Sequence, residues 1–142
     1  MIIKQLTVFI ENKTGRLNEV TQLLGNSGIN MSALSLADTS EFGILRMIVS
    51  DPEQALLILK GADFSARLTD VICLNSPNEP LALARALDIL SGEGVFIEYL
   101  YAYSMDNKSA NIVLKPDNIR KCIEVLQAHK LELVKASEMY KI

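Results

Sequence analysis

Apolar and polar residues alternate at the start of the chain, and the spacing then changes to that of a helix. Leu6, Val8 and Ile10 fall on one face of a strand. From residue 15 to 27 the apolar residues recur every three or four positions, and Gly28 follows where a helix typically ends. The opening segment therefore predicts a strand, a short polar turn and a helix.

The rest of the first half predicts two strands, a second helix and a last strand. Segments 30–37 and 44–49 alternate again, and the turn-rich segment 38–43 joins them. Asp51, followed by a proline, has the pattern of a helix N-cap with proline at the first helical position. Residues 64–68 predict the closing strand.

The second half repeats the first. A shift of 66 residues places Asn12 on Asn78 and Gly28 on Gly94, and after residue 43 the matching shift becomes 67. The repeated elements are strand 70–76, helix 80–91, strands 95–104 and 109–115, helix 118–129 and strand 131–136. We therefore expect two βαββαβ units, 1–69 and 70–142, of the ferredoxin-like α+β class.

The face of each sheet that points away from the helices is expected to be largely apolar. Its predicted members are Thr7, Phe9, Ile44, Arg46, Ile48, Val71, Cys73, Ile97, Tyr99, Tyr101, Tyr103 and Val113. A sheet face in water normally carries polar side chains. We therefore expect a second copy of the chain to cover this face, sheet on sheet, in a homodimer.

Composition narrows the class of partner. The 142 residues are 49% hydrophobic and 22% charged, which is typical of a globular protein. A net charge of −3 disfavours nucleic acid, because phosphate binding needs clustered Lys and Arg. No apolar run reaches the roughly 18 residues of a membrane span. The N-terminus lacks a signal-peptide pattern and the two cysteines are far apart, so we expect a cytoplasmic protein.

No residue pattern predicts catalysis, a metal or a cofactor. His129 falls at a helix end without a nucleophile or carboxylate in a triad pattern. Cys122 falls on the inner face of a helix, and Cys73 points outward on a strand, where we expect an interface thiol. The turn at 12–17 has one glycine and lacks the phosphate-binding patterns. The chain is therefore not expected to be an enzyme.

The turn at 12–17 has one remaining functional interpretation. The first N–H groups of the following helix could bind a small carboxylate, such as that of a free amino acid. The side-chain amide of Asn30 could pair with the same ligand. The structural alternative is that Thr14 caps the helix and Asn30 is a turn residue. The spacing alone does not decide between the ligand-binding and the structural interpretation.

Two pairs of motifs resemble a known family. Segment 12–17, NKTGRL, resembles the D-x-P-G-x-L turn of ACT domains, and 28–31, GINM, resembles their G-I-N-I step. The second half has NEPLAL at 78–83 and GVFI at 94–97, and 97–102, IEYLYA, resembles a phrase of stand-alone tandem ACT proteins. The chain thus resembles a tandem pair of ACT domains over essentially its whole length.

The resemblance implies an eight-stranded antiparallel sheet formed by two units side by side, with helices on one face. It also implies ligand sites at the seams, where 12–17 would face the segment near 95–98 and 78–83 would face 29–32. The implied ligand-binding residues are Asn12, Lys13, Thr14, Gly15, Arg16, Leu17, Asn30, Met31, Ser32, Asn78, Glu79, Pro80, Leu81, Phe96, Ile97 and Glu98.

The second unit departs from the motif. Leu81 stands where the family has glycine, and Phe96 stands where it has asparagine. A leucine is expected to crowd a backbone clamp, so the first turn should form the better site. The expected function is a non-catalytic amino-acid sensor that regulates amino-acid metabolism. The alternative is a regulatory subunit that docks through its apolar sheet face on a biosynthetic enzyme similar to acetolactate synthase.

Overall fold

The chain folds into two compact units, and each unit contains a short terminal segment from the other half of the sequence. The computed structural model describes residues 1–39 and 41–141, so Ser40, within the expected turn 38–43, lies outside the described residues. The first unit comprises Lys4–Thr69 together with the chain from Met139 onward. The second comprises Asp70–Glu138 together with Met1–Ile3. The first three residues thus belong to the unit built from the second half of the sequence.

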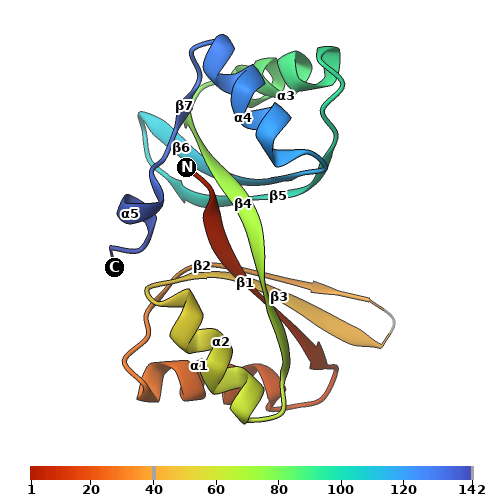
Figure 1. Ribbon diagram of the computed structural model, residues 1–142, viewed down its shortest axis with the longest axis vertical. Coiled ribbons are helices and arrows are strands. Elements are labelled where there is room, and N and C mark those ends of the chain that lie inside the picture. Colours follow the sequence, from red (N-terminus) through yellow and green to blue (C-terminus); the bar gives the residue numbers. More distant parts are fainter. Residues whose placement is uncertain (40, 142) are drawn as a thin grey trace. The chain divides into compact units, whose positions relative to one another are not determined.

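The first unit has the predicted βαββαβ order. Its elements are β1 (Ile3–Glu11), α1 (Arg16–Asn26), β2 (Met31–Asp38), β3 (Phe42–Val49), α2 (Pro52–Gly61) and the first part of β4 (Ser65–Pro77). The strands lie in the order β2, β3, β1, β4. In the antiparallel register of β1 with β3, Glu11 is opposite Phe42 and Val8 is opposite Leu45. Helices α1 and α2 lie together beside this sheet (Figure 1).

The second unit repeats this order with a reduced last strand. Its elements are the second part of β4, α3 (Ala82–Gly92), β5 (Ile97–Met105), β6 (Ser109–Pro116), α4 (Ile119–Ala128), β7 (Glu132–Leu133) and α5 (Ala136–Met139), the last of which also enters the first unit. Strand β6 pairs with β4 and β5, and β7 pairs with β4.

Two sequence predictions about the strands are wrong. The described residues form seven strands, not eight, because the expected strands 64–68 and 70–76 are one continuous strand, β4. Segment 65–77 has no glycine, and its one proline is the last residue, so nothing in it ends the strand. The expected strand 131–136 is reduced to the two residues of β7, and the short helix α5 follows it.

Each unit has its own hydrophobic core between sheet and helices. Leu6, Val8 and Leu24 are fully buried in the first core. Leu74, Leu90 and the predicted core residue Cys122 are buried in the second core. Fully burying such a side chain contributes about 1.5–3 kcal/mol. The inner faces predicted from the alternation are therefore confirmed.

The residues predicted for the outer sheet face differ in burial. Ile48, Val71, Cys73 and Val113 point away from the helices as predicted and are fully buried. The tyrosines of β5 are half-buried. The expectation that a second copy covers this face in a homodimer stays a prediction.

Candidate functional site

The turn between β1 and α1 leaves the start of the helix open. Gly15 is the N-cap residue of α1, with a left-handed backbone at φ 91°, and no side chain caps the helix. The alternative that Thr14 caps α1 is therefore wrong. No hydrogen bond among the described residues uses the backbone N–H groups of Leu17 and Asn18. These groups and the positive end of the helix dipole are available to an anion.

The charged side chains around this turn are paired with one another. Lys13 Nζ lies 3.0 Å from one Glu11 oxygen, and Arg16 Nη2 lies 3.4 Å from the other. Arg16 Nη1 also binds Glu19 at 3.0 Å. The hydrogen bond from Lys13 lowers the pKa of the Glu11 carboxyl, and the bond to Glu19 raises the pKa of Arg16. A ligand carboxylate therefore finds its free donors on the backbone.

Asn12 and Asn78 hold the two equivalent turns in place. The Asn12 amide donates to the Thr39 carbonyl at 3.4 Å, at the hairpin between β2 and β3. The Asn78 amide donates in the same way to the Asp106 carbonyl, and its backbone N–H donates to Lys108 O at 3.1 Å. Both asparagines were predicted as ligand-binding residues, and their bonds fix the turn against the hairpin.

A small cavity lies against the first turn. It measures about 200 Å³ and has apolar side chains together with Asn12, Lys13 and two acidic residues in its wall. Its lining residues are Ile10, Glu11, Asn12, Lys13, Leu17, Leu36, Asp38 and Gly43. The first unit therefore provides a concave surface at the turn that the sequence singled out.

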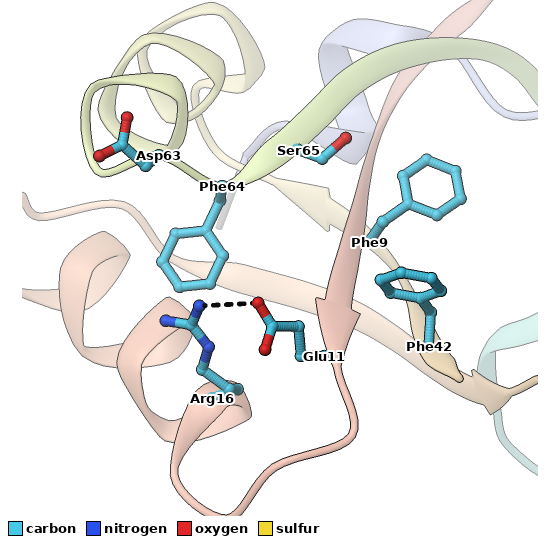
Figure 2. A pocket seen from close by; sticks show the side chains of 7 residues that line it. All are labelled: Phe9, Glu11, Arg16, Phe42, Asp63, Phe64 and Ser65. Atoms are coloured by element: carbon cyan, nitrogen blue, oxygen red, sulfur yellow. Dashed lines mark hydrogen bonds and ion pairs between the residues drawn. The ribbon is translucent and has the colours of Figure 1, made fainter. Parts of the chain in front are cut away.

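A larger cavity, of about 370 Å³, has Glu11 and Arg16 in its wall. Figure 2 shows the ion pair of these two residues with the Phe64 ring next to the guanidinium, whose carbon lies 5.2 Å from the ring centre. The complete lining is Phe9, Glu11, Arg16, Phe42, Asp63, Phe64 and Ser65. Of these only Arg16 was a predicted site residue. The others come from β1, β3, the α2–β4 connection and the start of β4, and no sequence motif joins them.

The turn of the second unit has the same backbone shape without glycine. Leu81 is the N-cap residue of α3 at φ 70°, where a leucine is strained, and its side chain is 66% exposed. Glu79 lies 4.0 Å from Arg85 in a loose ion pair, and Pro80 is exposed. A neighbouring cavity of about 200 Å³ is lined by Leu74, Ser76, Pro77, Glu79, Ala82, Arg85, Ala86, Ile89 and Leu131.

Asn30 lies at the opposite end of α1 from the turn. The helix has 11 residues, which separates its ends by about 16 Å. The Asn30 backbone N–H donates to Ser50 Oγ at 3.0 Å, and its side-chain oxygen accepts from the Met31 N–H at 3.1 Å. Ser32 Oγ donates to the Ile48 carbonyl at 3.2 Å. The two predicted halves of the site are thus not brought together within one unit.

The equivalent segment of the second unit repeats this arrangement with other side chains. The Phe96 N–H donates to Asp117 Oδ1 at 3.1 Å, and the Phe96 ring is 65% exposed. Ile97 is half-buried, and Glu98 pairs with Lys115 at 2.7 Å. The expected pairing of the first turn with this segment across a seam stays a prediction.

Comparison with known proteins identifies the family. The family model described as "ACT domain pair" matches residues 1–142. The chain belongs to the ACT domain pair family. A search among curated proteins found no significant match.

Solved structures agree with this ACT fold. Protein BT0572 from Bacteroides thetaiotaomicron is 51% identical, with a TM-score of 0.94, and the match covers 100% of this chain and 98% of that one. The ligand-free regulatory subunit of aspartate kinase from Thermus thermophilus is 14% identical with a TM-score of 0.65, over 89% and 93% of the two chains. The Thermus flavus regulatory subunit is 16% identical with a TM-score of 0.62, over 89% and 90%. The aspartate kinase subunits share the fold.

The ACT pair holds its thiols in a form unsuited to nucleophilic chemistry. Burial raises the pKa of Cys73 to about 12, and burial together with the charge of Asp117 raises that of Cys122 to about 11. His129 Nδ1 lies 3.0 Å from the Val125 carbonyl. The described part of the chain contains no cluster of metal-binding side chains, and none of its helices could span a membrane.

Proposed function

We propose that this ACT domain pair is a non-catalytic cytoplasmic sensor that binds a free amino acid and regulates amino-acid metabolism. The observation that carries the proposal is the open N-terminus of α1 behind Gly15, where no side chain provides a cap. A ligand carboxylate there would accept from the N–H groups of Leu17 and Asn18 and gain from the helix dipole. The small cavity beside the turn provides room for the rest of the molecule.

The remaining contacts are proposed to come from a second ACT unit. We assign the ammonium and side chain of the ligand to a segment equivalent to 29–32 or 95–98, because these segments lie far from the turn of their own unit. The turn of the first unit is the better clamp, since Gly15 leaves the backbone bare whereas Leu81 carries an exposed side chain.

The test is a thermal-shift screen of the full chain against the twenty amino acids. A ligand at 100 times its dissociation constant adds about 2.7 kcal/mol to the free energy of unfolding. At least one amino acid is expected to raise the melting temperature with a saturable dose dependence. A screen in which no amino acid does so would rule out the proposal.

A second candidate is a regulatory subunit that docks on a biosynthetic enzyme. The likeness of fold to the aspartate kinase regulatory subunits favours it. The apolar sheet face is the surface proposed for such docking. Affinity purification that recovers one biosynthetic enzyme in stoichiometric amount supports it, and recovery of the chain alone counts against it.

A further inference from the structure

The cavity beside the turn of the second unit lies against the hydrophobic core of that unit. Its lining residues come from α3, from the end of β4, from the turn between them and from Leu131, just before β7. Leu74 and Ala86 belong to the core and are 1% and 2% exposed. The volume is about 200 Å³, and an apolar cavity of about 150 Å³ is large enough to hold benzene. This cavity, the α3 cavity, therefore has room for a small ring in contact with core side chains.

The internal repeat explains why side chains do not fill this space. The smaller residues of the second unit are Ala82, Ala86, Ser76 and Leu131, in place of Arg16, Val20, Ile10 and Phe64. In the first unit Ile10 and Val20 are buried in the core, and the Arg16 guanidinium lies over the Phe64 ring. In the second unit Leu74, in place of Val8, restores a single methylene group. The cavity is thus a consequence of the sequence of the second unit and not of the fold itself.

The charges at the α3 cavity balance each other. Among the described residues that line it, Glu79 and Arg85 carry the charges, and they form an ion pair at 4.0 Å. Their side chains are 59% and 67% exposed, so water screens both charges. A ligand with a single charge, of either sign, would meet one attractive and one repulsive group, and it would lose hydration on entering an apolar space. The cavity therefore favours a ligand without charge.

Ser76 provides one polar group in the apolar wall. The residue is 6% exposed, and the alternation along β4 places its side chain on the same side of the strand as Leu74. Its hydroxyl donates to the carbonyl of Pro77 at 3.3 Å. A hydroxyl that donates one hydrogen bond still has lone pairs that can accept another. Small-molecule sites commonly combine an apolar lining with a few polar groups of this kind.

We propose that the α3 cavity binds a small uncharged molecule that combines a compact apolar group, phenyl or branched alkyl, with one hydroxyl. The apolar group packs against Ala86, Ile89 and Leu131. The ligand hydroxyl donates a hydrogen bond to Ser76 Oγ. Removal of the apolar group from water supplies most of the affinity. The site lies within the second unit and shares only Glu79 with the residues predicted to bind an amino acid, so it is independent of the amino-acid site proposed at the first turn.

The ligand class is tested by heteronuclear NMR titration of the full chain. The probes share a phenyl ring and are benzyl alcohol, benzyl methyl ether, benzylammonium and benzoate. Benzyl alcohol is expected to bind saturably and to shift the backbone amide signals of residues 74–76 and 82–89 most. The two charged compounds should bind at least about threefold more weakly, because each must lose hydration. The proposal is overturned if benzyl alcohol gives no saturable shift, if the largest shifts lie in the first unit, or if either charged compound binds as tightly.

The position of the apolar group is tested with Ala86→Val. The first unit has the fully buried Val20 at the equivalent place, so the fold accepts valine there. The variant should bind benzyl alcohol at least about fivefold more weakly, because valine takes the space of two carbon atoms of the ligand. Ala84→Val makes the same change on the exposed side of α3 and is the matched control, with the affinity of the wild type. Unchanged affinity in Ala86→Val, or an equal loss in both variants, would contradict the assignment, and the NMR spectrum shows whether each variant is folded.

The hydrogen bond is tested with Ser76→Ala. Wild type should bind benzyl alcohol about threefold more tightly than benzyl methyl ether, because the ether cannot donate to Ser76 Oγ. In Ser76→Ala this difference should disappear, while the affinity for the ether stays within about twofold of the wild-type value. If Ser76 served only the fold, the substitution would leave the ratio of the two affinities unchanged, and that result would overturn the assignment of the hydroxyl.

Discussion

Gly15 and Leu81 adopt nearly the same left-handed backbone conformation, at φ 91° and φ 70°. The sequence predicts that a leucine at this position crowds a backbone clamp for a ligand. A Cβ atom built on Gly15 would meet nothing within 4 Å, so the chain itself has room for a side chain there. Crowding therefore concerns only a ligand, and what glycine provides to the free protein is an unstrained turn.

Replacing Leu81 by glycine should stabilise the protein. The substitution relieves a left-handed leucine that costs about 1–2 kcal/mol, against a loss of roughly 0.5–1 kcal/mol from the added freedom of the unfolded chain. We expect a net gain of about 0.5–1 kcal/mol in the free energy of unfolding, measured by urea titration. Leu81→Ala keeps a Cβ and should show no such gain; an equal gain in both variants would contradict the strain argument.

The two thiols give the protein a specific dependence on alkaline pH. Their folded pKa values, about 12 for Cys73 and about 11 for Cys122, lie above the ordinary value of 9.0. The stability that the neutral thiols contribute is therefore complete below about pH 9 and is lost as the pH rises toward 11 and 12. Wild type should lose stability across this range more steeply than Cys73→Ala. Parallel stability curves for the two proteins would show that burial does not hold this thiol neutral.

Helix capping explains which N-termini are closed and which are open. Asp51 accepts a hydrogen bond from the Gln54 N–H at 3.1 Å and caps α2, as the Asp-Pro pattern predicts. Asn118 accepts from the Lys121 N–H at 3.1 Å and caps α4. In contrast α1 and α3 have no side-chain cap. Both units thus close the second helix and leave the first open, which places the anion-binding potential at the two predicted turns.

Three alanine substitutions test which of these residues cap a helix. Asp51→Ala and Asn118→Ala should each lower the free energy of unfolding by about 1 kcal/mol, because each removes a cap. Thr14→Ala should change it by less than about 0.5 kcal/mol, since Thr14 caps nothing. Chemical denaturation monitored by circular dichroism provides the comparison. A loss of stability in Thr14→Ala equal to that in Asp51→Ala would place a cap on α1 after all.

The sequence predicted α1 to α4 within a few residues, because hydrophobic spacing and end signals are local, but it did not predict the short helix α5. It divided β4 in two, because the repeat was expected to separate two strands, whereas residues 65–77 are uninterrupted. It missed the larger cavity because Phe42 and Asp63 are brought together only by the sheet and by the α2–β4 connection. Such a site depends on tertiary contacts that no short motif encodes.

At the scale of the whole molecule, an unpaired edge strand marks the surface where a second copy is expected. β2 is an edge strand, and its Leu34 and Leu36 are 54% and 52% exposed. Their register partners Met47 and Leu45 are core residues, so both leucines lie on the helix side of the edge. Exposed apolar edges of this kind favour pairing with another chain. The homodimer stays a prediction, and we expect it to pair through this edge.

Leu36→Lys should convert the dimer to a monomer, because it places a charge in the middle of the proposed contact. Sedimentation equilibrium would measure the mass of the assembly. Leu57→Lys, at a leucine on α2 that is 67% exposed, is the matched control and should leave the dimer intact. A monomeric wild type, or a dimer that Leu36→Lys leaves unchanged, would contradict the assignment.

The central claim, that the turn at 12–17 holds the ligand carboxylate, is tested most directly by calorimetric titration of the best amino acid from the thermal screen. The titration compares wild type with Gly15→Leu and Leu81→Ala, each below its melting transition. Gly15→Leu should weaken binding at least about tenfold, since it places a side chain over the open N–H groups that contribute about 1.5–3 kcal/mol when bonded to a charge. Leu81→Ala should leave the affinity within about twofold of wild type, because its turn is not the clamp; equal losses in the two variants would contradict the account.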